Sequence, residues 1–371
     1  MIVEPGFERV HDALTANLAA GEELGASIVV DIDGRRVVDV WGGHRDLARS
    51  EPWTEDTIVN VWSTSKLVTN LAALMLFDRG LLDPYAPVSQ YWPEFAAAGK
   101  ESVEVRHILS HTSGVSGWDR PCVVEDLYDA DKAAARLAVQ EPWWDSRTTS
   151  GYHAVSQGAL VGELVRRVTG KTLRQFVTEE IAGPLGADFQ IGAREQDWSR
   201  IADVVPPPVP TDIVPDPLKV RRRTFLGPAV RAESANTPEW RRAEIGAANG
   251  HGNARSVARI MSALARGGVV DGVRLLSDDA VALAFDEQTN GVDLALGVPL
   301  RFSMGYALPQ PDTVPYIPDG RICFWGGWGG SLTVVHPDSR MTFSYVMNKM
   351  GPGIVGSERA EQYLTAVYSS T

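Results

Sequence analysis

Runs of β-forming residues stand near both ends of this 371-residue chain, and they constrain the fold more than any other feature. Near the N-terminus, residues 26–32 and 35–41 are rich in Ile and Val and flank Asp33-Gly34, which is a strong hairpin signal. Near the C-terminus the same composition returns in three runs, residues 321–325, 332–335 and 341–347. The simplest arrangement joins all these strands in one antiparallel sheet, so the two ends of the chain should meet in space.

Between the two groups of strands, apolar residues recur at the three- and four-residue spacing of helices. The pattern predicts helices near the two ends over residues 7–20 and 358–368, and others over 63–79, 152–169, 173–181 and 255–266. We therefore expect an α+β fold. Residues 1–60 and 255–371 should form a lobe whose antiparallel sheet is flanked by terminal helices. Residues 61–254 should form a mainly helical second lobe, with the active site at the junction.

Six prolines lie between Val204 and Leu218, and they exclude a helix or a central strand there. We expect an extended loop that is too long to be a mere connection. Two interpretations stay open: the loop borders the substrate cleft, or it is a surface excursion.

Composition argues against several classes of partner. The net charge is −12, and no basic stretch stands out apart from Arg221-Arg222-Arg223, so nucleic acid is not expected. The two cysteines, Cys122 and Cys323, form no zinc or redox motif; their number suits a reducing compartment, and one disulfide is the alternative. No leader sequence and no apolar run of membrane-spanning length is visible. A cytoplasmic protein without a membrane partner is the expectation, and the oligomeric state stays open.

The helix predicted over residues 63–79 carries a Ser/Lys pair at its start. Ser63 and Lys66 are three residues apart, so a helical turn places both side chains on one face. The backbone N–H of a serine at a helix entrance points toward the group that its hydroxyl attacks, and the helix dipole favours the developing anion. A buried lysine one turn later can lose its proton near neutral pH and act as a base.

Two histidines, His107 and His111, have the i, i+4 spacing of a metal-binding helix. No Glu follows His107, and no third ligand suggests itself, so we do not expect a metal site. The pair is interpreted as tying a helix to the turn that follows it.

The order of these motifs resembles the serine β-lactamase and penicillin-binding protein superfamily. Members combine Ser-x-x-Lys with a later Tyr or Ser and a Lys/His-x-Gly motif on an edge strand. Here Tyr152 precedes a helix, and Trp325-Gly326-Gly327 ends a β-run. Residues 107–114, His-Ile-Leu-Ser-His-Thr-Ser-Gly, are similar to the superfamily's Leu-Leu-Ser-His-Thr-Ser-Gly segment. The resemblance covers roughly residues 7–368 and implies the β-lactamase/transpeptidase-like fold.

Trp in the third motif, where class C β-lactamases carry Lys, resembles the family VIII carboxylesterases. The resemblance implies a serine carboxylesterase that hydrolyses a small-molecule ester without a metal or organic cofactor. Ser63 would attack the carbonyl, with neutral Lys66 or the Tyr152 anion as base, and a lysine cation near the phenol should lower its pKa. The backbone N–H groups of Ser63 and Trp328 would hold the oxyanion. Trp325, Gly326 and Gly327 would contact the substrate.

One departure from the superfamily pattern concerns the second motif, which is often Tyr-x-Asn. Here it is Tyr152-His153-Ala154, so the Asn that helps to hold a β-lactam amide is absent. This favours an esterase, and the alternatives are a β-lactamase or D-amino-acid peptidase, an acyltransferase of the same fold, and a catalytically silent binding protein. An α/β-hydrolase is disfavoured because the chain contains no Gly-x-Ser-x-Gly.

Overall fold

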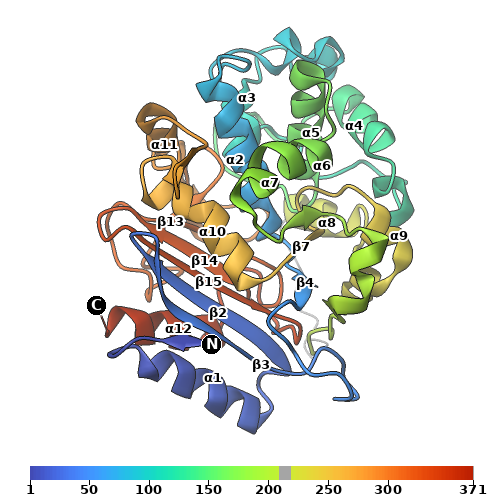
Figure 1. Cartoon of the computed structure of the whole chain (residues 1–371). Helices are drawn as coiled ribbons and strands as arrows, with labels where there is room; N and C mark the ends of the chain where they lie inside the picture. Colours follow the sequence, from blue (N-terminus) through green and yellow to red (C-terminus); the bar gives the residue numbers. More distant parts are fainter. Residues whose placement is uncertain (209–218, 371) are drawn as a thin grey trace.

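The computed structural model describes residues 1–208 and 219–370 and is built on a nine-stranded antiparallel sheet (Figure 1). The strand order is β1-β3-β2-β15-β14-β13-β12-β11-β10. The strands are β1 (Ile2–Val3), β2 (Gly25–Ile32), β3 (Arg35–Gly43), β10 (Thr289–Val292), β11 (Pro299–Phe302), β12 (Ala307–Leu308), β13 (Cys323–Gly326), β14 (Leu332–His336) and β15 (Met341–Met347).

The two ends of the chain meet where β2 pairs with β15, which confirms the arrangement predicted from the sequence. The register runs from Met341 opposite Ile32 to Met347 opposite Ala26. The hairpin of β2 and β3 turns at Asp33-Gly34, as its sequence predicts, and both residues have positive φ. Two terminal helices, α1 (Glu8–Ala20) and α12 (Glu358–Tyr368), cover one face, and α10 (Ala254–Ala265) lies against the other (Figure 1).

The remaining helices lie mostly in the central part of the chain. They are α2 (Ser65–Asp78), α3 (Val105–Leu109), α4 (Ala130–Val139), α5 (Ser156–Thr169), α6 (Leu173–Phe176), α7 (Gly183–Leu185), α8 (Lys219–Leu226), α9 (Pro238–Arg242) and α11 (Asp278–Leu283). Three predicted boundaries were wrong: α2 begins at Ser65, α5 begins at Ser156, and the helix expected over 173–181 changes after α6 into a π-helical turn, Val177–Ala182.

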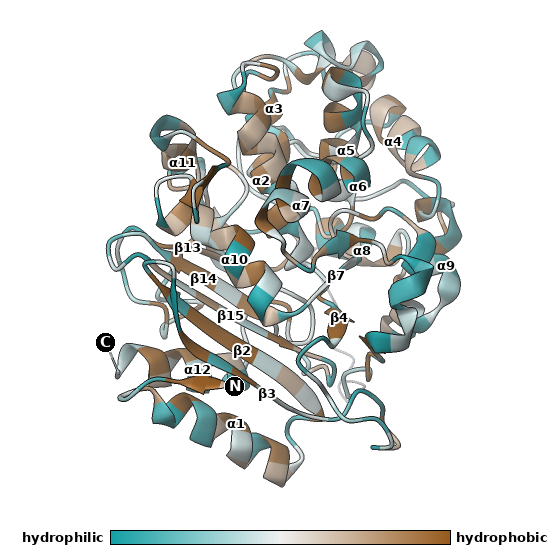
Figure 2. Cartoon of the chain, viewed as in Figure 1, coloured by the Kyte–Doolittle hydropathy of each residue, from teal (hydrophilic) through white to brown (hydrophobic). Residues whose placement is uncertain are grey.

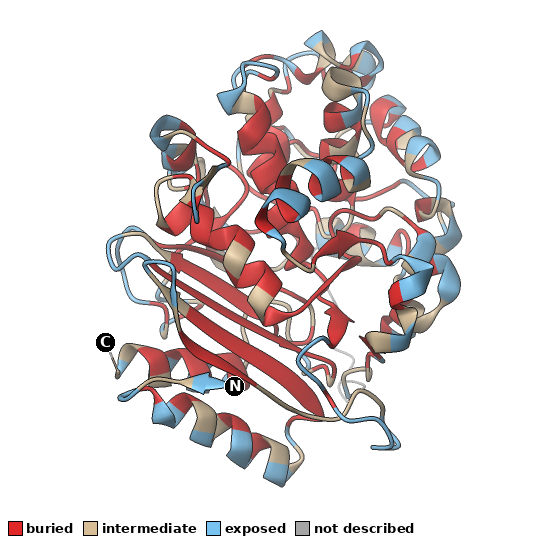
Figure 3. Ribbon diagram, viewed as in Figure 1, coloured by how far each residue is buried: buried red, intermediate tan, exposed pale blue. Residues whose placement is uncertain are grey.

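Helix α2 is the centre of the helical region. Every residue from Ser65 to Leu76 is buried, as Figure 3 illustrates for the core of the molecule. Its apolar side chains join those of α5, α10 and the large sheet in one continuous cluster, and the polar residues of the chain lie mainly on the outer helices (Figure 2). A helix that is buried on all sides is held in place by packing, so the residues at its start have fixed positions.

A second, small sheet was not predicted. Its strands are β4 (Ile58–Asn60), β5 (Gln190–Ile191), β6 (Ile201–Ala202) and β7 (Gly250–Gly252), and a two-stranded ribbon pairs β8 (Val269–Val270) with β9 (Val273–Arg274). Strands of two or three residues are too short to show an alternating pattern in the sequence. Because β4 pairs with β6 and β7, this sheet crosses the lobe boundary predicted at residue 60, and the division into two lobes stays a prediction.

Two further expectations concern the proline-rich segment and the absence of a membrane-spanning helix. Of the proline-rich segment 204–218, residues 209–218 lie outside the described residues, so its place relative to the cleft stays a prediction. Across residues 1–208 and 219–370, no helix combines the length and apolar character that crossing a bilayer requires.

Candidate active site

Ser63 lies in a tight turn between β4 and α2, two residues before the first residue of the helix. The sequence placed it in the first helical turn, so this detail was wrong. The backbone N–H of Lys66 donates to the Ser63 carbonyl over 3.0 Å, which keeps the expected relation between the two residues. Trp62 has φ of 50°, a left-handed conformation that is unusual for a bulky residue and sets the direction of the turn.

Lys66 meets Ser63 as the three-residue spacing predicts. Its Nζ lies 3.0 Å from Ser63 Oγ, and it donates to the backbone carbonyls of Ala154 over 2.7 Å and Ala247 over 2.9 Å. Burial lowers the pKa of Lys66 well below its ordinary value. Ala154 occupies the position of the absent Asn, and its backbone takes part in the site although its side chain cannot.

Tyr152 lies in the loop before α5 and completes a group of three buried side chains. Ser63, Lys66 and Tyr152 are exposed by only 8%, 1% and 1%. The Lys66 Nζ is 4.9 Å from the centre of the phenol ring. The pKa of Tyr152 was expected to be lowered, and the net direction is the opposite: burial raises the pKa of Tyr152, against hydrogen bonds with Ser63 and Trp325 that lower it.

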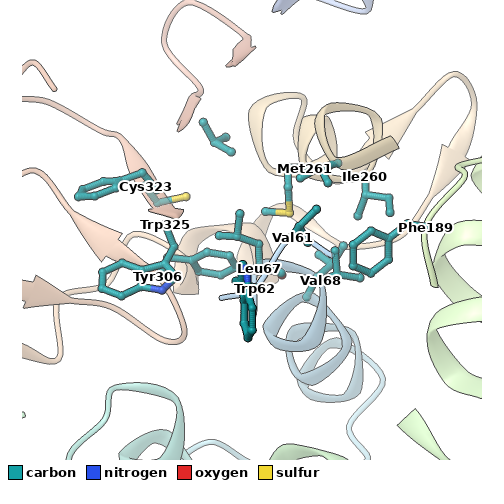
Figure 4. Close-up of a cluster of buried hydrophobic side chains, with 14 of the residues drawn as sticks. Val61, Trp62, Leu67, Val68, Phe189, Ile260, Met261, Tyr306, Cys323 and Trp325 are labelled. Carbon is teal, nitrogen blue, oxygen red and sulfur yellow. Dashed lines mark hydrogen bonds between the residues drawn. The ribbon is translucent and has the colours of Figure 1, made fainter. Parts of the chain in front are cut away.

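Trp325 belongs to the same cluster, on strand β13. Its indole Nε1 donates to Tyr152 Oη over 3.1 Å, and its ring packs beside the phenol with the ring centres 5.0 Å apart. Figure 4 shows Trp325 and Cys323 from β13 in one buried cluster with Val61 and Trp62. The N–H of the indole is therefore already used within the protein.

The glycines after Trp325 allow the end of β13 to approach the turn that carries Ser63. This strand was expected at the edge of the sheet, which was wrong, because β13 pairs with both β12 and β14. A Cβ atom on Gly327 would lie 2.4 Å from the Val61 carbonyl oxygen, and one on Gly326 would lie 2.4 Å from the Ser331 carbonyl oxygen. The close neighbours that require glycine here are therefore the protein's own backbone. Ser331 reinforces this contact, because its hydroxyl lies 3.1 Å from the Thr64 hydroxyl.

Trp328, the second residue expected to hold an oxyanion, follows on the same turn. Its indole packs edge-on against Trp62 with the ring centres 5.1 Å apart, and Trp240 packs against Trp62 at 5.5 Å. Trp62 immediately precedes Ser63, so this stack brings the segments of the two expected oxyanion donors side by side.

Residues that the sequence analysis missed hold the Tyr152 loop. The Asp293 carboxylate accepts the Tyr152 N–H over 3.0 Å and two N–H groups of its own turn, those of Ala295 and Leu296, over 2.8 Å each. Asp293 is fully buried, and burial raises its pKa. Since it lies 141 residues from Tyr152 on the loop between β10 and β11, no local sequence signal could have identified it.

Buried histidines hold the backbone of the segments next to the site. His107 Nδ1 accepts the Glu104 N–H over 3.0 Å at the start of α3, and His111 Nδ1 accepts the His153 N–H over 3.1 Å. Burial lowers the pKa of His107 to about 4 and that of His153 to about 3, so both rings are neutral at pH 7. Within the ranges that the structure covers, no group of three or more His, Cys, Asp or Glu is placed to hold a metal ion.

Comparison with known proteins gives a consistent result over almost the whole chain. The sequence model of the family described as "Beta-lactamase" matches residues 10–367. The chain is 34% identical to "Esterase/beta-lactamase LipL" of Mycobacterium tuberculosis (strain ATCC 25618 / H37Rv), across 96% of this chain and 84% of that protein.

Solved structures agree with the sequence comparison. A crystal structure of a family VIII carboxylesterase superposes with a TM-score of 0.94 at 38% identity, covering 100% of this chain and 99% of the other. A penicillin-binding protein homologue from Caulobacter crescentus superposes with a TM-score of 0.93 at 35% identity, with the same coverage. Proteins named as an esterase/β-lactamase, a carboxylesterase and a penicillin-binding protein homologue are therefore all similar to this chain.

Proposed function

The chain belongs to the β-lactamase family and is a hydrolase of the serine β-lactamase fold, and from that premise we propose that it is a carboxylesterase that hydrolyses neutral esters through an acyl-enzyme on Ser63. The observation that carries the proposal is the contact of 3.0 Å between Lys66 Nζ and Ser63 Oγ in a buried site. The similarity to a family VIII carboxylesterase and to an esterase/β-lactamase supports esters as the substrates.

Lys66 is the base in this proposal. A neutral amine has two N–H bonds and one lone pair, and Lys66 has two carbonyl neighbours that only accept, those of Ala154 and Ala247. With both N–H bonds used, the lone pair faces the Ser63 hydroxyl. The lowered pKa of Lys66 makes this neutral form accessible near neutral pH.

Tyr152 then works as a neutral phenol rather than as an anion. Its pKa is raised by burial, and its oxygen accepts the Trp325 N–H, so its own proton is available to Ser63 Oγ. In the acylation step the Ser63 proton passes to Lys66 as the bond from Oγ to the carbonyl carbon forms and the carbonyl electron pair moves to oxygen. Backbone N–H groups of Ser63 and Trp328 stabilise that oxyanion.

Collapse of the tetrahedral intermediate breaks the bond between the carbonyl carbon and the alcohol oxygen. The proton held by Lys66 returns through the Tyr152 hydroxyl to the departing oxygen, so the alcohol leaves neutral. Water then attacks the acyl-enzyme carbonyl and gives a proton to Lys66. The bond from the carbonyl carbon to Ser63 Oγ breaks, the proton held by Lys66 passes to Oγ, and the acid is released.

Trp325 makes the site unfavourable for β-lactams, which carry a carboxylate next to the reactive carbonyl. A lysine there would offer a cation, and charge-assisted hydrogen bonds are about twice as strong as neutral ones. The buried indole has only one N–H, which Tyr152 already accepts. A carboxylate at this place would lose water without gaining a partner, whereas a neutral ester avoids that cost.

The test compares p-nitrophenyl butyrate with a chromogenic cephalosporin, using the full-length protein and Ser63→Ala as the control. The ester should be hydrolysed well and the cephalosporin slowly or not at all, while Trp325→Lys should narrow the gap. Cephalosporin hydrolysis by the unmodified protein at a rate comparable to its best ester would assign the chain to the β-lactamases instead. Ester hydrolysis that survives Ser63→Ala would refute the proposed nucleophile.

A further inference from the structure

A surface cavity of about 490 Å³ lies where the loop after α3 meets α8, and it is lined by Trp118, Asp119, Arg120, Arg222 and Arg223 rather than by the proposed catalytic residues. This volume lies within the ~300–1,000 Å³ typical of small-molecule sites. Arg221-Arg222-Arg223 is the one run of three basic residues in a chain of net charge −12. The cavity thus concentrates positive charge on a protein that is otherwise acidic.

Among the described residues that line the cavity, Asp119 is the one carboxylate against three arginines. It already accepts the Trp143 indole N–H over 3.0 Å and pairs with Arg223. Arg120 donates to the carbonyl of Leu226. In the described part of the chain Arg222 has no hydrogen bond or ion pair, so its planar set of donors is available to a ligand.

The walls of the cavity are held in place. The Trp118 indole is buried and donates to the Ala133 carbonyl over 2.8 Å, and the Trp118 N–H donates to Gly227 beyond α8 over 3.2 Å. The Arg223 guanidinium lies over the Trp143 ring, 4.2 Å from its centre. The fixed Trp118 ring and the stacked Arg223 guanidinium reduce the entropy lost when an anion binds.

The same loop reaches the proposed catalytic site. Ser113, five residues before Trp118, shares a hydrogen bond of 2.6 Å with His153, the residue after Tyr152. The Trp143 N–H donates to the Gly114 carbonyl over 2.7 Å. A ligand in the cavity therefore contacts the loop that supports the Tyr152 turn.

We propose that this cavity binds an anionic group, a carboxylate or phosphate, carried by an organic molecule. Arginine matches the geometry of both groups with paired hydrogen bonds. This rests on the proposed function and extends its substrate class: the favoured source is an acidic group at the far end of an ester that is neutral around its reacting carbonyl, where Trp325 disfavours a carboxylate. A free anion is the other source of the same chemistry.

Binding is measured first, without catalysis, so that the anion site and the esterase proposal can fail separately. Inorganic phosphate and glutarate are titrated by calorimetry into three proteins: the Ser63→Ala variant, the same variant that also carries Arg222→Gln, and the same variant that also carries Arg231→Gln. Arg231 is an exposed arginine outside the cavity, so both variants change the net charge equally. Affinity should fall about threefold to tenfold with Arg222→Gln, the range for one partly solvated charge-assisted hydrogen bond, and stay unchanged with Arg231→Gln.

Kinetics then identify the source of the anion. Mono-p-nitrophenyl glutarate and p-nitrophenyl valerate have acyl chains of equal length, and only the first ends in a carboxylate. If the substrate supplies the anion, Arg222→Gln lowers kcat/KM for the glutarate ester alone, and phosphate competes with that ester alone. If calorimetry shows binding but the two esters respond alike, the site takes a free anion. Absence of binding to the unsubstituted cavity, or equal losses with Arg222→Gln and Arg231→Gln, would overturn the proposal.

Discussion

Replacing Lys66 by Met and Tyr152 by Phe, singly and together, tests whether the two groups act on one proton. Lys66 Nζ lies 3.0 Å from Ser63 Oγ, and Tyr152 is hydrogen-bonded with the same serine. A general base typically contributes about 10²–10⁴ in rate, which equals about 2.7–5.4 kcal/mol at 1.36 kcal/mol per tenfold. Each single variant should therefore lose at least about a hundredfold in kcat.

The kcat of the double variant shows whether Lys66 and Tyr152 act together or independently. If each change removes part of one relay through Ser63 Oγ, the second change finds little left to remove, as in other catalytic groups that act as a unit. Its kcat for p-nitrophenyl butyrate should then be close to that of the slower single variant. A loss equal to the product of the two single losses would show independent action and refute the coupling.

A second buried lysine provides a control for stability. Lys100 is fully buried and donates to the carbonyls of Ala97 and Gln140, much as Lys66 donates to Ala154 and Ala247. Leaving a buried carbonyl unpaired costs about 1–3 kcal/mol, so Lys100→Met should lower the melting temperature about as Lys66→Met does. Only Lys66→Met should lose kcat; equal losses would mean that the effect at Lys66 is structural.

Three further expectations follow from the same contacts. Lys66 must be neutral to accept a proton, so kcat/KM should fall as the pH falls through the pKa of Lys66. Because burial lowers that pKa, the loss of kcat/KM should begin well below pH 10.5. A pH profile of kcat/KM that is flat down to the pH of unfolding would contradict this. Asp293→Ala should lower kcat about tenfold or more by freeing the Tyr152 N–H, and Asp293→Asn, which keeps an acceptor, should lose less; the reverse order would exclude the anchoring role. Trp325→Phe removes the N–H donor to Tyr152 and should lower kcat about twofold to tenfold with little change in KM; a change in KM alone would mean that the indole serves only to bind substrate.

The sequence predicted the elements that have a strong local pattern. The hairpin around Asp33-Gly34, the strand 341–347 and the helix 358–368 lie where their periodicity placed them. The Ser63/Lys66 contact was also predictable, because a spacing of three residues fixes it once a helical turn forms. Tyr152 was found through its place in the superfamily pattern, since its distance along the chain gives no geometric information.

What the sequence could not give depends on burial and on contacts between distant segments. The pKa of Tyr152 was expected to fall beside a lysine, but the cost of charging a buried phenol raises it and outweighs the hydrogen bonds with Ser63 and Trp325 that lower it. Trp325 was expected to face the substrate, and its N–H proved to be a partner of Tyr152. The carbonyls that hold Lys66 leave no mark in the sequence, because a backbone acceptor has no residue preference. The Asp293 carboxylate leaves none because it is 141 residues from its partner Tyr152.

The most direct test of the account is covalent labelling of the nucleophile. After incubation with an organophosphonate ester, mass spectrometry of the digested protein should show the added mass on Ser63, and Ser63→Ala should remain unlabelled. Ser65 is the internal control, because its hydroxyl donates to the Trp62 carbonyl and accepts the Gly250 N–H. Label on Ser65 or Ser331 in the unmodified protein, or undiminished labelling of Ser63→Ala, would contradict the assignment of Ser63.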